Sequence, residues 1–296
     1  MPETPDPAAG VIHDIGYRRY DGARDGTATL ARTLYVTGLR HAYGLGRSPR
    51  SRILPFVLLG ITTLPAAIVV GVLAVFGAPE LPVTYAAYTN QTGILVTLFA
   101  AAQAPVLFSR DLRHRSIVLY LARPLPAAAF AVVRWLSLTT AVLAFMLLPT
   151  LVLYAGALLA GLDVTDETTG LLKAVTLQLL LAAMLAGVTG LISSVSLRRG
   201  FAVVGSVLVL VVGGGVVSVV QAIAQEEGAA TVGVAVGLAS PQVLVTGLGN
   251  AWGVARDALA VPTGAGWVTA YVAAGLLLAA ACVALLVLRF RKVGAR

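Results

Sequence analysis

The chain has 296 residues, of which 58% are hydrophobic and 11% are charged, and its mean hydropathy is +0.90. Soluble globular domains are typically about half apolar and about a quarter charged, so this composition excludes an ordinary soluble domain and requires a bilayer. The net charge is +8, and the single cysteine, Cys282, excludes a disulfide or a cysteine metal cluster within the chain.

The first 52 residues form a polar arm that we expect on the cytoplasmic side. No apolar run precedes Arg52, and the run at 53–76 is too long for a signal peptide, so we expect it to be retained as the first span. Within the arm, Leu30, Leu34, Leu39 and Tyr43 recur near helical spacing. This pattern predicts an amphipathic interfacial helix over 27–43.

An all-α membrane domain with six spanning helices is predicted over 53–288, followed by a basic tail at 289–296. The apolar segments lie at 53–76, 92–108, 127–160, 171–197, 200–224 and 267–288. The second segment is short for a span, and the third is long enough to contain a break at Pro149. The run Gly213 to Gly215 either permits close helix packing or loosens the fifth span as a hinge.

The basic residues indicate the orientation of the spans. With the N-terminus in the cytoplasm, 19 of the 21 basic residues lie inside, and only Lys173 and Arg256 lie outside. The positive-inside rule therefore places both termini in the cytoplasm. The net charge is a topology signal with some attraction to membrane lipids, and we expect no nucleic-acid partner.

The spans carry little that could perform chemistry. Once Arg134 and Lys173 are treated as interfacial, the six segments contain no Asp, Glu, Lys, Arg or His. An ion-driven transporter or an intramembrane enzyme needs such groups, so both classes are disfavoured. No phosphate-binding loop of the form GxxxxGK[ST] occurs either, and no histidine has a partner at metal-ligand spacing. We expect no catalytic site, metal or cofactor on this chain.

Several lone polar residues within the spans, including Ser206 and Gln221, have two interpretations. They either hydrogen-bond between helices as part of the packing or line a translocation path. The candidates for the path are Thr62, Thr63, Gln103, Thr139, Thr140 and Gln178.

A charged stretch at 109–135 separates the second span from the third. Asp111 is suited to cap a short helix, and Pro124 ends it, so a helix lying across the membrane surface is predicted. A basic loop between spans is also what topology requires of any membrane protein. The stretch is more specific than that, because Asp111, Leu119-Tyr120-Leu121, Arg123-Pro124-Leu125, Phe130 and Arg134 follow one another in order.

This combination resembles the cytoplasmic loop of ABC-2-type transporter permeases, and Tyr17 to Gly22 resembles the stretch before their first span. The resemblance implies a bacterial plasma-membrane permease whose loop is the coupling helix that docks on a separate cytoplasmic ATPase. It also implies two copies of each subunit, with ATP and Mg on the ATPase. The implied coupling residues are Asp111, Arg113, Arg115, Tyr120, Arg123 and Arg134.

The apolar connection at 225–266 is expected to form short re-entrant helices in the outer leaflet. Ser240-Pro241 is typical of a helix start, and Leu244, Leu248 and Trp252 follow near helical spacing. A second short helix is predicted at 255–259. The resemblance implies that such helices cap the path from outside, with Pro241, Leu244, Leu248 and Trp252 as the cap residues.

The leading hypothesis from the sequence is a permease subunit of an ATP-driven exporter that moves a hydrophobic or amphiphilic compound. The alternative is a membrane anchor or regulatory scaffold that holds a soluble partner without transporting anything. Co-purification of an ATPase would favour the exporter.

Overall fold

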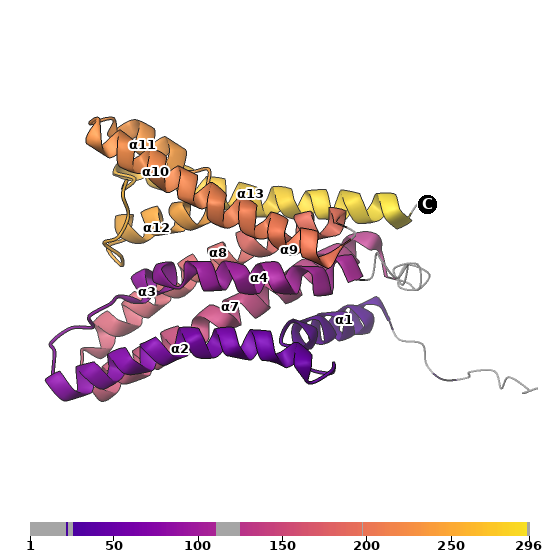
Figure 1. The fold of residues 1–296 in the computed structure, drawn as a ribbon, viewed down its shortest axis with the longest axis horizontal. Coiled ribbons are helices and arrows are strands. Elements are labelled where there is room, and N and C mark those ends of the chain that lie inside the picture. The colour runs from indigo at the N-terminus through magenta and orange to yellow at the C-terminus, as the bar shows by residue number, and fades with distance from the viewer. Residues whose placement is uncertain (1–21, 23–25, 111–124, 197, 295–296) are drawn as a thin grey trace, which may run out of the picture.

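The computed structural model describes residues 22, 26–110, 125–196 and 198–294, and every regular element within these ranges is a helix (Figure 1). The helices are α1 (Thr27–Ala42), α2 (Arg50–Phe76), α3 (Tyr85–Gln91), α4 (Gly93–Leu107), α7 (Ala127–Leu159), α8 (Val164–Val195), α9 (Arg199–Val207), the π-helical turn η1 (Leu208–Val212), α10 (Gly213–Glu226), α11 (Ala230–Gly237), α12 (Pro241–Ala251) and α13 (Gly264–Gly294).

Five helical segments in the described part of the chain are long and apolar enough to cross a membrane. They are Arg50–Phe76, Ala127–Leu159, Val164–Val195, Arg199–Glu226 and Gly264–Lys292. These match five of the six predicted segments, so the chain is an all-helical, multi-pass membrane protein. The first and fourth of these helices are largely exposed, because their apolar side chains face outward where lipid would lie.

The second predicted segment forms a shorter helix, α4, which follows α3 after a break at Thr92. Thr92 belongs to the end of one helix and the start of the other, since its N–H donates to the Tyr88 carbonyl at 3.1 Å and its carbonyl accepts from the Val96 N–H at 3.1 Å. The two helices therefore follow one another through the bundle (Figure 1). Most side chains of α4 are buried, which makes it the central helix of the bundle.

The two positions at which the sequence allowed an interruption of a long helix are both helical. Helix α7 continues through Pro149, as proline is tolerated where neighbouring helices satisfy the backbone, and α7 packs on α1, α2, α4, α8 and α13. Residues Gly213 to Gly215 are also helical, and the irregular turn η1 lies just before them.

The predicted amphipathic helix is present as α1. Its buried residues, Leu34, Gly38 and Ala42, face α7 and α4. The Tyr35 hydroxyl donates to Thr140 Oγ1 at 2.9 Å, and the Tyr43 hydroxyl donates to the Ala141 carbonyl at 2.8 Å. These contacts fix α1 against one end of the bundle.

The charges divide between the two ends of the bundle. At the end that carries α1 and the C-terminus, burial and the nearby charges of Arg110 and Arg199 lower the pKa of Arg47. We call this the basic end. Glu80, Asp163, Asp166 and Glu167 line one pocket at the opposite end, near the start of α8, which we call the acidic end.

Two short helices, α11 and α12, lie in the connection before the last long helix, at the acidic end (Figure 1). Helix α12 begins at Pro241 as predicted, but the helix predicted at 255–259 is absent. Gly253 ends α12 with φ = 70°, and the Val254 and Ala255 N–H groups turn back to the Gly249 carbonyl. The second short helix is α11, which precedes α12.

Candidate functional site

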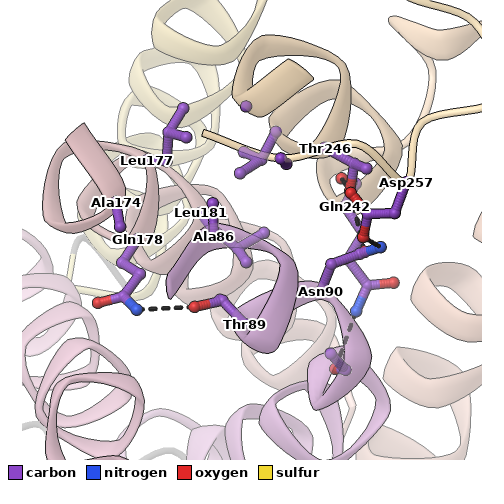
Figure 2. A pocket seen from close by; sticks show the side chains of 14 residues that line it. Ala86, Thr89, Asn90, Ala174, Leu177, Gln178, Leu181, Gln242, Thr246 and Asp257 are labelled. Atoms are coloured by element: carbon purple, nitrogen blue, oxygen red, sulfur yellow. Dashed lines mark hydrogen bonds between the residues drawn. The ribbon is translucent and has the colours of Figure 1, made fainter. Parts of the chain in front are cut away.

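A polar pocket lies beneath α12, where the break between α3 and α4 meets α8 and α10 (Figure 2). It has a narrow inner part of ≈ 20 Å³ and a wider part of ≈ 370 Å³. Both parts are lined by Asn90, Gly93, Gln242, Thr246 and Asp257. The inner part has room for about one water molecule, and the wider part has the size of a small-molecule site.

Gln178 of α8 forms one wall of the inner part. Its side chain is 1% exposed, and its Nε2 donates to Thr89 Oγ1 at 2.7 Å and to Thr150 Oγ1 at 2.8 Å (Figure 2). No described residue donates a hydrogen bond to its Oε1. An acceptor without a partner in an apolar bundle is costly, and this oxygen is itself buried and points away from Thr89 (Figure 2).

Gln242 of α12 contacts the break in the second span. Its Nε2 donates to the Gly93 carbonyl at 2.9 Å and to Thr97 Oγ1 at 2.6 Å. The Gly93 carbonyl also accepts from Thr97 Oγ1 at 2.9 Å, so Gln242 of α12 joins a hydrogen-bonded group at the start of α4. The break therefore has a polar lining rather than a purely apolar one.

Asn90 at the end of α3 joins α12 to the loop that follows it. Its Nδ2 donates to Asp257 Oδ2 at 2.6 Å, and its Oδ1 accepts from Thr246 Oγ1 at 2.9 Å. Asn250 Nδ2 adds a weaker bond to Asp257 Oδ1 at 3.4 Å. Together these four side chains hold α12 over the pocket.

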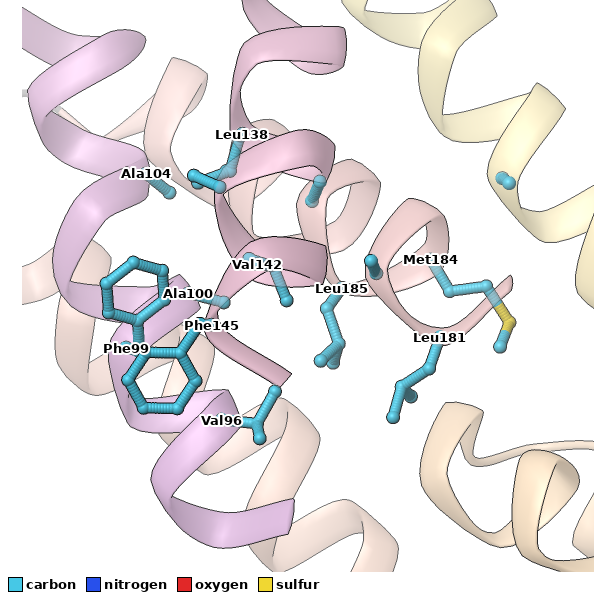
Figure 3. Packing of buried hydrophobic residues seen from close by; sticks show 14 of the residues in the cluster. Val96, Phe99, Ala100, Ala104, Leu138, Val142, Phe145, Leu181, Met184 and Leu185 are labelled. Atoms are coloured by element: carbon cyan, nitrogen blue, oxygen red, sulfur yellow. The ribbon is translucent and has the colours of Figure 1, made fainter. Parts of the chain in front are cut away.

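The pocket ends in the tightly packed core of the bundle. Toward the basic end, Val96, Phe99, Phe145, Leu181 and Leu185 are buried against one another (Figure 3). The rings of Phe99 and Phe145 stack with centroids 4.5 Å apart. A ligand in the pocket could not pass to the basic end without a rearrangement of this core.

On one side, the wider part of the pocket reaches the exposed surface between α4 and α10. Ile94 at this opening is 64% exposed, and Gly215 and Leu259 beside it are exposed as well. Polar groups open to lipid would be costly. This opening therefore needs a cover in the membrane.

Of the six candidate path residues, only Gln178 lines the pocket. Thr62 and Thr140 take part in helix packing, since Thr62 Oγ1 donates to carbonyls one turn earlier and Thr140 accepts from Tyr35. Gln103 is buried in α4, away from the pocket. The hydroxyls of Thr63 and Thr139 are buried without a hydrogen-bond partner in the described residues.

The predicted cap residues all lie on or next to α12. Leu244 and Leu248 are buried in the core cluster, Pro241 is the first residue of α12, and Trp252 follows its last turn. These side chains anchor α12, while its polar residues face the pocket.

Of the predicted coupling residues, the structure describes only Arg134. Asp111, Arg113, Arg115, Tyr120 and Arg123 fall outside the described residues. Arg134 lies near the start of α7 and is 4% exposed, and its guanidinium carbon is 5.4 Å from the centre of the Phe130 ring. Its side chain does not reach the surface, so any part that it has in coupling passes through the elements packed on it.

Sequence reasoning missed most of the pocket. Thr89, Asn90, Gln242, Thr246 and Asp257 lie just outside the predicted spans or in the connection. The one available signal was the polar run Thr89 to Thr92, which directly precedes an apolar segment that is too short to span.

The pocket gives no sign of a metal centre. Within the described ranges, no group of three or more His, Cys, Asp or Glu residues is placed to hold a metal ion. The pocket offers amide, hydroxyl and carboxylate groups above an apolar floor, which suits reversible binding of an amphiphile. Comparisons with protein-family models, with curated proteins and with solved structures find no match.

Proposed function

We propose that this chain is the membrane-spanning subunit of an ATP-driven exporter of the ABC-2 type. The observation that carries the proposal is the polar pocket at an interrupted helix inside an otherwise apolar bundle. Interrupted helices with polar linings are typical substrate sites in transporters, because they place hydrogen-bonding groups where an ordinary span has none. The mixture of amide and hydroxyl groups with apolar walls favours an amphiphilic or hydrophobic substrate.

In this proposal α3 and α4 together form the second of six spans. Tyr85 to Leu107 covers 23 residues, or roughly 34 Å of helix, which is enough to cross the hydrocarbon core. The basic end then faces the cytoplasm with both termini, and the acidic end faces outward. Helices α11 and α12 dip into the outer leaflet and cap the path, and the pocket is its outer part.

The energy for transport is proposed to come from a separate ATPase. Apart from Arg134 and Lys173, the six predicted segments contain no ionisable group that could couple transport to an ion gradient, and the chain lacks a phosphate-binding loop. The loop at 109–135 would dock the ATPase, with ATP and Mg bound there. Two permease copies and two ATPase copies would form the transporter in a bacterial plasma membrane.

The pocket can be blocked by a single substitution at Gly215. A Cβ added there meets no atom within 4 Å, so Gly215→Leu fits and places its side chain in the wider part of the pocket. Gly213→Leu is the matched control, since Gly213 is equally open but does not line the pocket. Both changes favour the helix by up to about 1 kcal/mol, so neither should unfold it.

The measurement is transport of fluorescent amphiphilic dyes by inside-out vesicles that contain the chain and its co-purified ATPase. We expect Gly215→Leu to abolish transport and dye-stimulated ATP hydrolysis, and Gly213→Leu to retain both. Equal transport by the two variants would contradict the assignment of the pocket. Failure of any ATPase to co-purify, with no dye transport by the wild type, would favour the anchor or scaffold.

A further inference from the structure

An apolar groove of ≈ 660 Å³ runs between α8 and α13, separate from the polar pocket. It exists because small side chains face each other there: Ala183 on α8 and Ala279, Ala280 and Ala284 on α13. Trp135 and Trp252 also line the groove. The helices meet closely where Gly187 faces Cys282 and where Gly275 faces Leu180.

The groove is about as long as one bilayer leaflet is thick. Its lining residues on α13 run from Val272 to Ala284, which is roughly 18 Å along the helix axis. The hydrocarbon core of a bilayer is about 30 Å thick, so one leaflet is about 15 Å. The volume also lies within the range of about 300–1,000 Å³ that is usual for small-molecule sites. A single acyl chain fits these dimensions.

A cation lies next to the groove. Lys173 lines the neighbouring pocket at the acidic end, three residues before the groove residue Thr176 on α8, and its Nζ donates to the carbonyl of Trp252, another groove residue, at 3.3 Å. From Lys173 to Ser194, near the other end of α8, the axis rises by roughly 32 Å. Lys173 therefore lies at headgroup level on the acidic end when the rest of α8 crosses the hydrocarbon.

The charges around Lys173 favour a zwitterion over an anion. Asp166 is seven residues before Lys173, which puts it on the same face of α8, two turns farther out. Asp163 caps α8 through two backbone N–H groups, and Glu167 accepts a hydrogen bond from the Tyr85 hydroxyl. Glu80 lines the same pocket. An anionic headgroup would meet this negative field.

We propose that the α8–α13 groove binds a zwitterionic aminophospholipid of the phosphatidylethanolamine class. One acyl chain fills the groove, the phosphate accepts from Lys173, and the ammonium group donates to Asp166. The apolar groove, Lys173 and Asp166 follow one another along α8 in the same order as the acyl chain, phosphate and ammonium group of the lipid. An ammonium group donates three hydrogen bonds to carboxylates, and a trimethylammonium group donates none, so a choline lipid should bind less tightly.

The test is quenching of tryptophan fluorescence by lipids with brominated acyl chains. Trp267 is replaced by Phe, which leaves the two groove tryptophans, and the protein is reconstituted in vesicles of phosphatidylethanolamine, phosphatidylcholine or phosphatidylglycerol. We expect severalfold tighter quenching by the ethanolamine lipid. Lys173→Gln should remove this preference and Lys173→Arg should keep it, while Arg256→Gln, which removes the other outer cation, should leave it unchanged.

A matched pair of substitutions on α13 tests the part of the groove that would hold the acyl chain. Ala280→Leu fills the groove and should reduce quenching by every lipid, while Ala281→Leu, on the exposed surface of the same helix and outside the groove lining, should not. Melting temperatures of the variants report whether they fold. Equal quenching by all three headgroups, a preference for the glycerol lipid or one that survives Lys173→Gln would overturn the proposal. So would absent quenching in every vesicle, which would indicate a second copy of the chain in the groove.

Discussion

The least expected residue in the bundle is Gln178, a fully buried amide whose nitrogen and oxygen differ in their hydrogen bonding. Its nitrogen has two threonine partners, while its oxygen has none among the described residues. An unsatisfied buried acceptor typically costs about 1–3 kcal/mol. The nitrogen side of this amide lies against Thr89, which lines the inner part of the pocket together with Gln178.

We therefore predict that Gln178→Met lowers transport without lowering stability. Methionine has a similar length and removes the unsatisfied oxygen. Thr89 and Thr150 keep a partner, because each hydroxyl also lies within hydrogen-bond distance of the carbonyl four residues earlier, at 3.0 and 2.9 Å. The melting temperature in detergent should stay the same or rise, while dye transport falls.

Gln103→Met is the control for this substitution. Gln103 is also buried, but it lies in α4 away from the pocket. Transport should persist in this variant. If both variants lose transport equally, the effect is a general one of buried amides, and Gln178 has no special part in the pocket.

At the scale of elements, the cap helices depend on one aromatic residue of α13. Tyr271 is fully buried, and its hydroxyl donates to the Val234 carbonyl of α11 at 2.6 Å. Gly247 of α12 lies against the same ring, since an added Cβ would come within 2.9 Å of Tyr271 Cε1. Gly237 of α11 is even closer to the hydroxyl. Both short helices thus pack against Tyr271.

Gly237→Ala should disturb the cap. The new methyl group would overlap the Tyr271 hydroxyl and come within 2.8 Å of Gln221 Nε2. Overpacking of this kind costs about 1–3 kcal/mol, which exceeds the gain from replacing a helical glycine. We expect a lower melting temperature and reduced transport. Gly213→Ala, where an added Cβ meets nothing, should melt at or above the wild-type temperature; the same response from both would mean that Tyr271 does not seat the cap.

The elements that sequence patterns predicted well are those that depend on local rules. Apolar runs identified five long helices, and the alternation of leucine with arginine identified α1. Proline at the first helical position identified the start of α12. The helix predicted at 255–259 failed because Gly253 turns the chain and Asp257 binds Asn90, a residue 167 positions away. No local pattern contains that contact.

At the scale of the molecule, the distribution of charge between the two ends could be predicted from the sequence, but the pocket could not. Counting arginines and lysines anticipated a bundle with a basic and an acidic end. The pocket instead brings together α3, α4, α8, α10 and α12, and its residues are ordinary polar side chains when considered singly. Gln178 was chosen along with five other polar residues that do not line the pocket, because the sequence does not tell which side of a helix faces an opening.

The opening of the pocket toward the lipid needs a cover. The six spans of the proposed permease are few to enclose a path for a sizeable substrate, and the wider part of the pocket opens between α4 and α10, beside the exposed Ile94. A second copy of the chain would shield these polar groups from lipid, so we expect a homodimer through this face. Mass measurement in mild detergent should find two copies per particle. Ile94→Trp should lower the dimer fraction, while Leu277→Trp, at an equally exposed position on α13, should not. One copy per particle in the wild type, or equal effects of the two substitutions, would place the cover elsewhere.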